Sequence, residues 1–304
     1  MYFSLFVERM KNMPAEFMEK GGAGGDWYFS CPICREPLEK REKVCRCPRG
    51  HSFDVSAEGY VHLLPRNRMH SSLPGDTKEM VAARRRFLES GAYELFSREL
   101  NGTVLFCMEQ APRPLLLDTG CGEGYYTGHM ASTLEKAGVN ARILGYDISK
   151  AAVRAAARRY GKQAEFAVAS SFAVPVRDGI SGVTVNVFAP VVPEELRRVT
   201  APGGFFILAV PSERHLFGMK KVLYEKPYEN TRRDTEYPGF RFLSRREVRG
   251  ELTLTDPSLI EDLFSMTPYY WKTPESGSRR LREVSSLHTE IGFDFLLYRR
   301  EEEK

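Results

Sequence analysis

The sequence predicts an α/β protein with a mostly parallel sheet, preceded by a small cysteine-rich segment. From residue 114 onward, short apolar strands alternate with helical segments. Such strands, separated by helices, indicate a parallel sheet that is covered on both faces. Near the start, four of the six cysteines fall between Cys31 and Cys47. The first residues lack the pattern of an export signal, so we expect none, and this clustering then favours metal binding over disulfides.

Composition sets broad limits on the function. The chain has 304 residues, of which 42% are hydrophobic and 28% are charged, as expected for a globular protein with one large and one small domain. The net charge of +4 permits a nucleic-acid partner but does not argue for one. No run of 18 apolar residues is present, so we expect no transmembrane helix and no membrane partner.

Changes in composition along the chain divide it into four parts. Residues 1–26 are expected to form a flexible N-terminal extension, because the stretch GGAGG at 21–25 cannot hold a fixed conformation cheaply. A metal-binding domain is expected over 27–65 and a helical linker or lid over 66–110. The remaining part, 111–304, is expected to form the large α/β domain.

The elements of the large domain follow from apolar patterning and helix signals. Strands are expected over 115–117, 143–146, 165–169, 183–188, 205–210 and 291–298, and helices over 151–160 and 258–266. In the linker, Asp76 or Thr77 is a plausible N-cap for a helix that runs to about Ser90. The segment 225–250 is polar, aromatic and basic, and is interpreted as an irregular insertion.

The cysteine-rich segment carries a set of metal ligands. Cys31 and Cys34 form a C-x2-C pair, and Cys47 and His51 form a C-x3-H pair after a gap of 12 residues. Three thiolates and one imidazole suit tetrahedral Zn²⁺, and no open position is implied, so the zinc should be structural. Cys45 could replace Cys47, although the C-x3-H spacing favours Cys47. The competing interpretation, a set of reduced thiols without metal, is disfavoured by the spacing.

A glycine-rich turn follows the first strand of the large domain. It reads DTGCGEG over 118–124, and its glycines let the backbone approach a ligand. The G-x-G-x-G spacing differs from the G-x-G-x-x-G of a dinucleotide loop. Opened by an acidic residue, the turn is similar to the S-adenosylmethionine loop of class I methyltransferases. The expected cofactor-binding residues here are Asp118, Gly120, Gly122, Glu123 and Gly124, with the acidic members holding ammonium and hydroxyl groups.

A second acidic residue, Asp147, ends the second strand of the large domain. A carboxylate there can accept hydrogen bonds from both ribose hydroxyls of a nucleoside. Together the turn and Asp147 predict a class I S-adenosylmethionine-dependent methyltransferase domain, with a Rossmann-like, mostly parallel sheet of seven strands. A similar fold that has lost its ligand is disfavoured because both motifs are present. Residues 169–171, after the third strand, are expected to contact the adenine.

From Phe29 onward, apart from 225–250, the chain closely resembles the bacterial 23S ribosomal RNA guanine-N1 methyltransferase family. The stretches that carry the resemblance are SCPIC at 30–34, EGYVHLLP at 58–65, PGD at 74–76, ARR at 83–85, FL at 87–88, GAY at 91–93, GCGEGYYT at 120–127, VASS at 168–171, RHL at 214–216 and MTP at 266–268. These stretches, in this order, are more specific than the glycine-rich turn alone.

The resemblance implies a cytoplasmic enzyme that transfers a methyl group from S-adenosylmethionine to N1 of a guanine in a 23S rRNA hairpin loop. It implies an N-terminal zinc ribbon that helps to hold the RNA, and a possible homodimer. It also implies cofactor contacts at Tyr93, Gly122, Glu123 and His215, with Tyr93 acting as a lid. Without the resemblance, Tyr93 would be interpreted as a core aromatic residue and His215 as a surface histidine.

Two other functions are alternatives to this one. A small-molecule methyltransferase would share the cofactor loop but would have no reason to carry a zinc ribbon. A non-catalytic zinc-ribbon RNA-binding protein would have no need of Asp118 or Asp147. No residue is assigned as a general base, since the acidic residues are better explained as cofactor ligands. Phe188, at the end of the fourth strand, could stack on the target base or could be a buried core residue.

Overall fold

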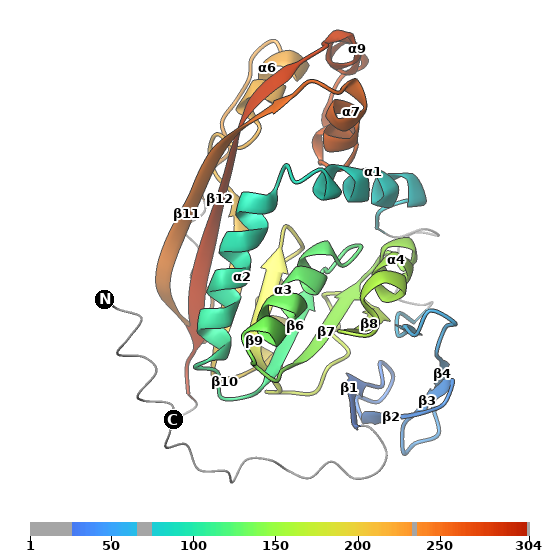
Figure 1. The fold of residues 1–304 in the computed structure, drawn as a ribbon. Coiled ribbons are helices and arrows are strands. Elements are labelled where there is room, and N and C mark those ends of the chain that lie inside the picture. Colours follow the sequence, from blue (N-terminus) through green and yellow to red (C-terminus); the bar gives the residue numbers. More distant parts are fainter. Residues whose placement is uncertain (1–25, 66–74, 233–235, 303–304) are drawn as a thin grey trace.

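The computed structural model describes residues 26–65, 75–232 and 236–302 (Figure 1). The extension expected over residues 1–26 therefore lies outside the described part, except for Asp26, where the first strand begins. Within the described ranges, no helix is both long enough and apolar enough to span a bilayer.

The cysteine-rich segment, residues 26–65, folds into a four-stranded antiparallel sheet. Its strands are β1 (Asp26–Ser30), β2 (Pro37–Arg41), β3 (Val44–Arg46) and β4 (Ser52–Asp54), paired in that order. These strands are short, and the small sheet buries few apolar side chains of its own, among them Leu38 and Cys45. A sheet of this size needs a metal or a packing partner to be stable.

A second sheet of eight strands forms the body of the protein. Its order is β11-β12-β10-β9-β6-β7-β8-β5. The strands are β5 (Val61–His62), β6 (Leu115–Thr119), β7 (Arg142–Asp147), β8 (Glu165–Val168), β9 (Ser181–Val187), β10 (Thr200–Pro211), β11 (Phe240–Leu254) and β12 (Leu287–Arg300). All neighbours pair in parallel except β12, which is antiparallel to β10 and to β11. Seven strands come from the large domain, as predicted, and β5 adds an eighth from the cysteine-rich segment.

Nine helices accompany the strands within the described residues. They are α1 (Lys78–Glu89), α2 (Glu94–Met108), α3 (Tyr125–Lys136), α4 (Lys150–Tyr160), α5 (Pro193–Val199), α6 (Phe217–Leu223), α7 (Pro257–Ser265), α8 (Tyr269–Lys272) and α9 (Glu275–Glu283). The first begins at the predicted cap, since the Thr77 hydroxyl accepts a hydrogen bond from the Met80 amide at 3.3 Å. In Figure 1, α1 lies between α7 above it and α4 below it, and it contacts both.

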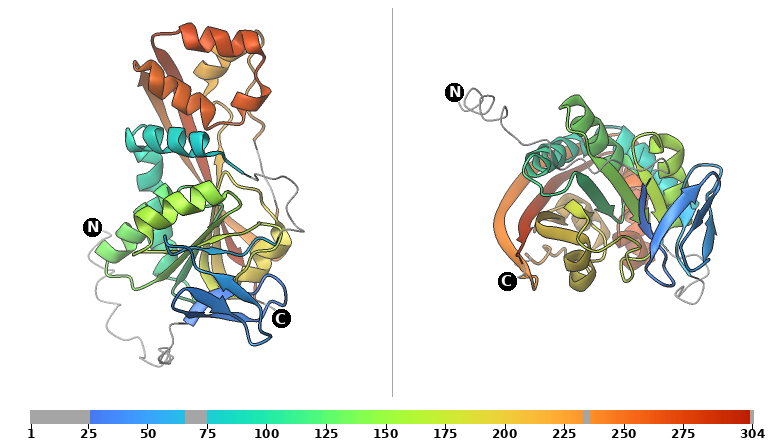
Figure 2. Two further views of the ribbon diagram at one scale, coloured as in Figure 1. Left: turned by 90° about the vertical axis from the view of Figure 1, so that its right-hand side faces the viewer. Right: turned by 90° about the horizontal axis from the view of Figure 1, so that it is seen from below.

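Alternating side chains show which layer covers each face of the large sheet. Leu116 and Ile207 belong to the core formed with helices α2 to α4. On the opposite face, Leu117 packs with the cysteine-rich segment, and Phe206 packs with Leu196 of α5. The view from below in Figure 2 shows the cysteine-rich segment and α5 on the same side of the sheet. The cysteine-rich segment therefore occupies a layer that helices fill in other doubly wound folds.

Backbone pairing fixes this layer to the sheet. Val61 of β5 pairs with Ala167 of β8, and the Leu63 amide donates to the Val168 carbonyl at 2.8 Å. On the other side, the Ser30 amide donates to the Pro175 carbonyl at 2.8 Å. The cysteine-rich segment and the sheet consequently share one hydrophobic core.

The interpretation of 225–250 as an irregular insertion was wrong for its second half. Residues 240–254 form β11, which pairs with β12 along its whole length. Its only buried residues are Phe240, Val248 and Leu254. Because β11 is an edge strand that is exposed over most of its length, it lacks the apolar alternation by which a half-buried strand is identified.

The shared core predicts that one substitution in the cysteine-rich segment destabilises the whole protein. Phe29 is fully buried against the sheet, so Phe29→Ala should lower the free energy of unfolding by about 3–5 kcal/mol. Urea unfolding followed by far-UV circular dichroism measures this, and the curve should shift as a single transition. Ile33→Ala, at a position that is 61% exposed, is the matched control and should leave the curve unchanged. A separate early transition, with the rest unshifted, would contradict the shared core.

Candidate functional site

The predicted metal ligands lie together in space. Ligand atoms of Cys31, Cys34, Cys47 and His51 are all within 4.8 Å of one another. His51 Nδ1 is 3.5 Å from Cys31 Sγ and 3.4 Å from Cys47 Sγ, and the Cys34 and Cys47 sulfurs are 3.6 Å apart. Tetrahedral zinc, with bonds of about 2.0–2.3 Å, requires ligand separations of roughly 3.5–3.8 Å. The four side chains therefore fit Zn²⁺.

Two turns hold these ligands in place. In the first, the Arg35 amide donates to the Cys31 carbonyl at 2.8 Å. In the second, the Gly50 amide donates to the Cys47 carbonyl at 2.9 Å, and Gly50 has a φ of +84° that favours glycine. Cys45, the alternative ligand, is not part of the group. It lies on β3, fully buried in the core shared with the sheet.

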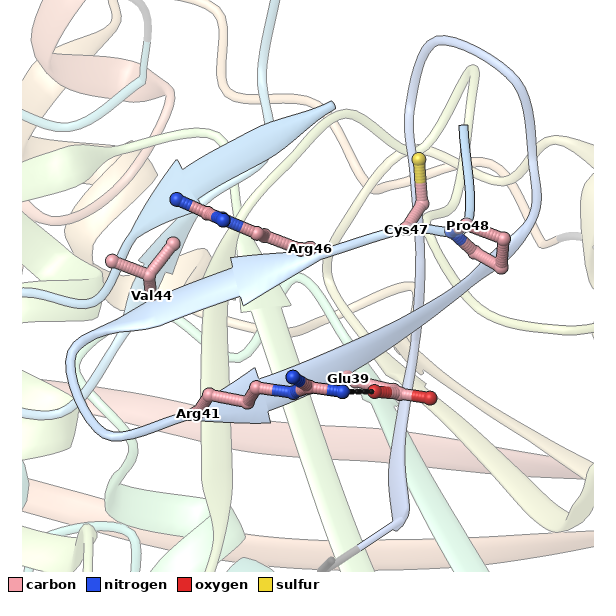
Figure 3. Close-up of a pocket in the computed structure, with 6 residues that line it drawn as sticks. All are labelled: Glu39, Arg41, Val44, Arg46, Cys47 and Pro48. Carbon is pink, nitrogen blue, oxygen red and sulfur yellow. Dashed lines mark hydrogen bonds and ion pairs between the residues drawn. The ribbon is translucent and has the colours of Figure 1, made fainter. Parts of the chain in front are cut away.

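The hairpin beside the metal ligands presents charged side chains to solvent. Figure 3 shows a pocket lined by Glu39, Arg41, Val44, Arg46, Cys47 and Pro48. Arg41 donates to Glu39, two residues earlier on β2, at 3.0 Å, and the sulfur of Cys47 points away from this ion pair. The pocket thus belongs to the surface of the cysteine-rich segment and is separate from the glycine-rich turn.

The glycine-rich turn lies between the ends of β6 and β7, where it begins α3. The amides of Gly120 and Cys121 both donate to the Tyr146 carbonyl at 2.9 Å. Gly120 has a φ of +80°, and a Cβ there would lie 2.3 Å from the Cβ of Ala189. A Cβ at Gly122 would meet open space, so this part of the turn faces outward and is accessible to a ligand.

Asp147 is oriented by the backbone around it. One carboxylate oxygen accepts from the Gly122 amide at 3.0 Å and the other from the Ser149 amide at 2.8 Å. Burial raises the pKa of Asp147, and these two hydrogen bonds oppose the rise. The second predicted acidic residue is therefore joined to the turn and fixed at the end of β7.

Two acidic groups of the turn itself are buried and incompletely paired. Asp118 accepts from the Thr127 hydroxyl at 2.5 Å, and burial raises its pKa to about 7. Glu123 accepts from Arg85 Nε at 3.2 Å, and burial also raises its pKa, against the effect of Arg85. One oxygen of each carboxyl has no hydrogen-bond partner among the described residues. Such orphaned acceptors are rare in folded proteins and suit a cationic ligand group.

Tyr93 and His215, the two cofactor contacts implied by the resemblance, lie against each other although they are 122 residues apart in sequence. Tyr93 Oη is 3.5 Å from His215 Nε2, and both side chains are buried. The Gly292 amide donates to His215 Nδ1 at 3.3 Å, so the neutral ring carries its hydrogen on Nε2. Burial lowers the pKa of His215 to about 3, with a contribution from the charge of Lys220. The histidine is therefore uncharged at neutral pH.

Phe188 is neither a buried core residue nor an ordinary surface residue. It follows β9 with a φ of +56° and is 44% exposed. Left-handed backbone is an outlier for a bulky side chain. Its ring lies nearly parallel to Phe96, with centroids 5.8 Å apart, and to His215 at 6.5 Å. The fold thus holds an aromatic face beside the predicted cofactor loop.

Asn186 belongs to the site but was not predicted from the sequence. Fully buried near the end of β9, it donates to the Thr119 hydroxyl at 3.0 Å and to the Pro190 carbonyl at 3.4 Å. It also accepts from the Ala189 amide at 3.3 Å. Asn186 therefore shapes the turn that carries Phe188. The signal was a single amide residue within the apolar stretch VTVNVF.

The metal ligand set gives a testable difference between two cysteines. Cys34→Ser should lower the zinc content of the purified protein, because it removes a thiolate from the group. Cys45→Ala should retain zinc, since Cys45 lies outside the group. Metal analysis by inductively coupled plasma mass spectrometry measures both variants. Zinc loss in Cys45→Ala with retention in Cys34→Ser would show that the ligand set is wrong.

Family models match two parts of the chain. One, described as "RlmA, N-terminal", matches residues 29–72, and another, described as "Methyltransferase domain", matches residues 116–204. These ranges contain the metal ligands and the glycine-rich turn, respectively.

Similar proteins extend the match to most of the chain. A 23S rRNA (guanine(748)-N(1))-methyltransferase of Streptomyces fradiae is 35% identical over 86% of this chain and 92% of its own length. A protein of Micromonospora griseorubida, provisionally named a 23S rRNA (guanine-N(1)-)-methyltransferase, is 33% identical over 81% of this chain and 88% of its own. A Bacillus subtilis protein, also provisionally named a 23S rRNA (guanine-N(1)-)-methyltransferase, is 27% identical over 88% of this chain and 96% of its own length. The chain belongs to the 23S rRNA (guanine-N1-)-methyltransferase family.

Proposed function

We propose that this protein transfers a methyl group from S-adenosylmethionine to N1 of a guanine in a hairpin loop of 23S rRNA. The observation that carries the proposal is the extent of the similarity. The match to the Streptomyces fradiae enzyme covers 86% of this chain and 92% of that enzyme, and family models match the cysteine-rich segment and the methyltransferase domain separately. A small-molecule methyltransferase would need only the second of these parts.

The residues around the glycine-rich turn fit S-adenosylmethionine, which supplies an electrophilic methyl group when bound. Gly122 leaves room for the ligand beside the backbone, whereas Gly120 and Gly124 let the turn pack closely against Ala189 and Ala156. Asp147 is placed to accept from the ribose hydroxyls. The unpartnered oxygens of Asp118 and Glu123 offer acceptors for the ammonium group. This assignment explains why two carboxyl oxygens are buried without partners.

The exposed face of Phe188 is the proposed platform for the guanine. The next residue, Ala189, packs directly against Gly120, so the platform lies beside the glycine-rich turn that is proposed to hold the methyl donor. Stacking on an aromatic ring is a common way to hold an unstacked RNA base. The strained backbone at Phe188 is consistent with a functional position, because strain is retained where the surroundings enforce it.

Tyr93 and His215 supply uncharged hydrogen-bond donors rather than a base. Burial raises the pKa of the Tyr93 phenol, so it stays protonated. His215 uses its Nδ1 lone pair on the Gly292 amide and keeps its hydrogen on Nε2. Neither side chain can therefore accept the N1 proton of guanine at neutral pH. We assign them to closing and orienting the site.

The cysteine-rich segment is proposed to hold zinc and to help bind the RNA. Its surface carries the arginines shown in Figure 3, next to the metal ligands. We place the enzyme in the cytoplasm, where ribosomal RNA is found. The homodimer that the family resemblance implies stays a prediction.

Primer extension on unmodified 23S rRNA tests the proposal. After incubation with protein and S-adenosylmethionine, methylation of N1 blocks the Watson–Crick face, so reverse transcriptase should stop one nucleotide before the target. Phe188→Ala should slow the appearance of this stop roughly tenfold or more, because base stacking contributes about 1–3 kcal/mol. Phe106→Ala, at another exposed phenylalanine, is the matched control and should react at the wild-type rate.

Two results would contradict this account. If no cofactor-dependent stop appears on RNA shown to be unmodified at the start, the proposed function is wrong. If the stop appears but Phe188→Ala reacts as fast as the control, the platform is wrong while the function stands.

A further inference from the structure

Arg84 carries a donor that the protein leaves without a partner. Its guanidinium donates to Asp76 at 2.6 Å and lies 3.4 Å from the Met266 carbonyl. Its Nε atom is buried and has no partner among the described residues. Burying an unpaired donor of a charged group is costly. The next two residues of α1 are also arginines but differ, because Arg85 Nε donates to Glu123 and Arg86 Nε donates to Asp262.

Arg84 lies on the side of α1 that faces the site. Burial raises the pKa of Asp147, of Tyr93 and of Tyr126, and in each case the charge of the Arg84 guanidinium opposes that rise. Its partner Asp76 is also tied to the site. The Asp76 carbonyl accepts from the Ser149 hydroxyl at 2.7 Å, and the Ser149 amide donates to Asp147. Arg84 is thus fixed near the ribose-binding residue and the predicted lid.

The unpartnered atoms around the turn are chemically complementary to an amino acid. Asp118 and Glu123 each present an orphaned acceptor, and Arg84 presents an orphaned cationic donor. The methionine end of S-adenosylmethionine carries one ammonium and one carboxylate. The acidic pair suits the ammonium, which leaves the carboxylate in need of a cation. A guanidinium is the side chain best matched to a carboxylate.

We propose that Arg84 binds the α-carboxylate of the methionine part of S-adenosylmethionine. This inference rests on the proposed function. It adds that Arg84 makes the protein bind the full cofactor more tightly than a nucleoside that lacks the amino-acid end. Asp76 then acts as a positioning residue, because it orients the guanidinium while leaving Nε available. The alternative is that the Arg84–Asp76 pair serves only to fasten α1 to the sheet domain.

Binding of two nucleosides, measured by isothermal titration calorimetry on the full-length zinc-loaded protein, separates these roles. S-adenosylhomocysteine has the amino-acid end, whereas 5′-methylthioadenosine lacks it. Arg84→Gln should weaken binding of S-adenosylhomocysteine roughly tenfold to a hundredfold and leave binding of 5′-methylthioadenosine unchanged. Arg84→Lys, which keeps the charge, should lose less.

The controls use the neighbouring ion pairs. Arg86→Gln breaks a comparable arginine–aspartate pair on the same helix, with Asp262, and should bind both nucleosides like wild type. Asp76→Asn should keep most of the preference for S-adenosylhomocysteine, because the cation remains. Equal losses for both nucleosides in Arg84→Gln, or no loss, would overturn the role of Arg84 alone. Failure of the wild-type protein to bind S-adenosylhomocysteine would overturn the proposed function as well.

Discussion

The close approach of Gly120 to Ala189 is the constraint on which the rest of the site depends. A side chain at residue 120 would place its Cβ 2.3 Å from that of Ala189, so the turn after β6 and the turn after β9 can meet only if residue 120 is glycine. The first turn is the predicted holder of the methyl donor, and the second carries Phe188. Under the proposed function, their contact would bring the methyl donor and the guanine together, and methyl transfer gains much of its rate from such positioning. Buried Asn186 and the backbone bonds to Tyr146 keep both turns in register.

The charge distribution of the site is consistent with positioning rather than with base catalysis. The acidic residues lie around the glycine-rich turn, where a sulfonium-containing amino acid would place its ammonium and ribose groups. The rings that lie against Phe188 are those of Phe96, Phe293 and neutral His215. Neutral aromatic neighbours are suited to stacking on a flat base. The reactive chemistry is then left to the cofactor.

The cysteine-rich segment is a structural layer of the enzyme as well as a candidate RNA contact. It covers the face of the sheet opposite α2 to α4, and β5 extends the sheet beyond β8. Loss of zinc would therefore disturb more than the candidate RNA-contacting surface. β8 leads directly into residues 169–171, where adenine contacts are expected, so the cysteine-rich segment and the expected adenine site share one edge of the sheet.

Local chemistry was predictable from the sequence, whereas long-range packing was not. The metal ligands, the glycine-rich turn and Asp147 are short patterns whose spacing is set by a ligand or by a strand end, so they could be identified without coordinates. β11 was missed because an edge strand with few buried residues lacks alternation. The merging of the cysteine-rich segment with the sheet was missed because β5 has two residues and no pattern. In the sequence, Arg84 is only part of one of the stretches that carry the family resemblance, and its unpaired Nε required the structure.

The most direct test of the account is the chemical identity of the product. 23S rRNA is incubated with the protein and S-adenosylmethionine carrying a deuterated methyl group, digested to nucleosides and analysed by liquid chromatography with mass spectrometry against the isomeric methylguanosine standards. The account predicts that the label appears in 1-methylguanosine. Label in another methylguanosine isomer or in another nucleoside, or no label in the RNA, would contradict it.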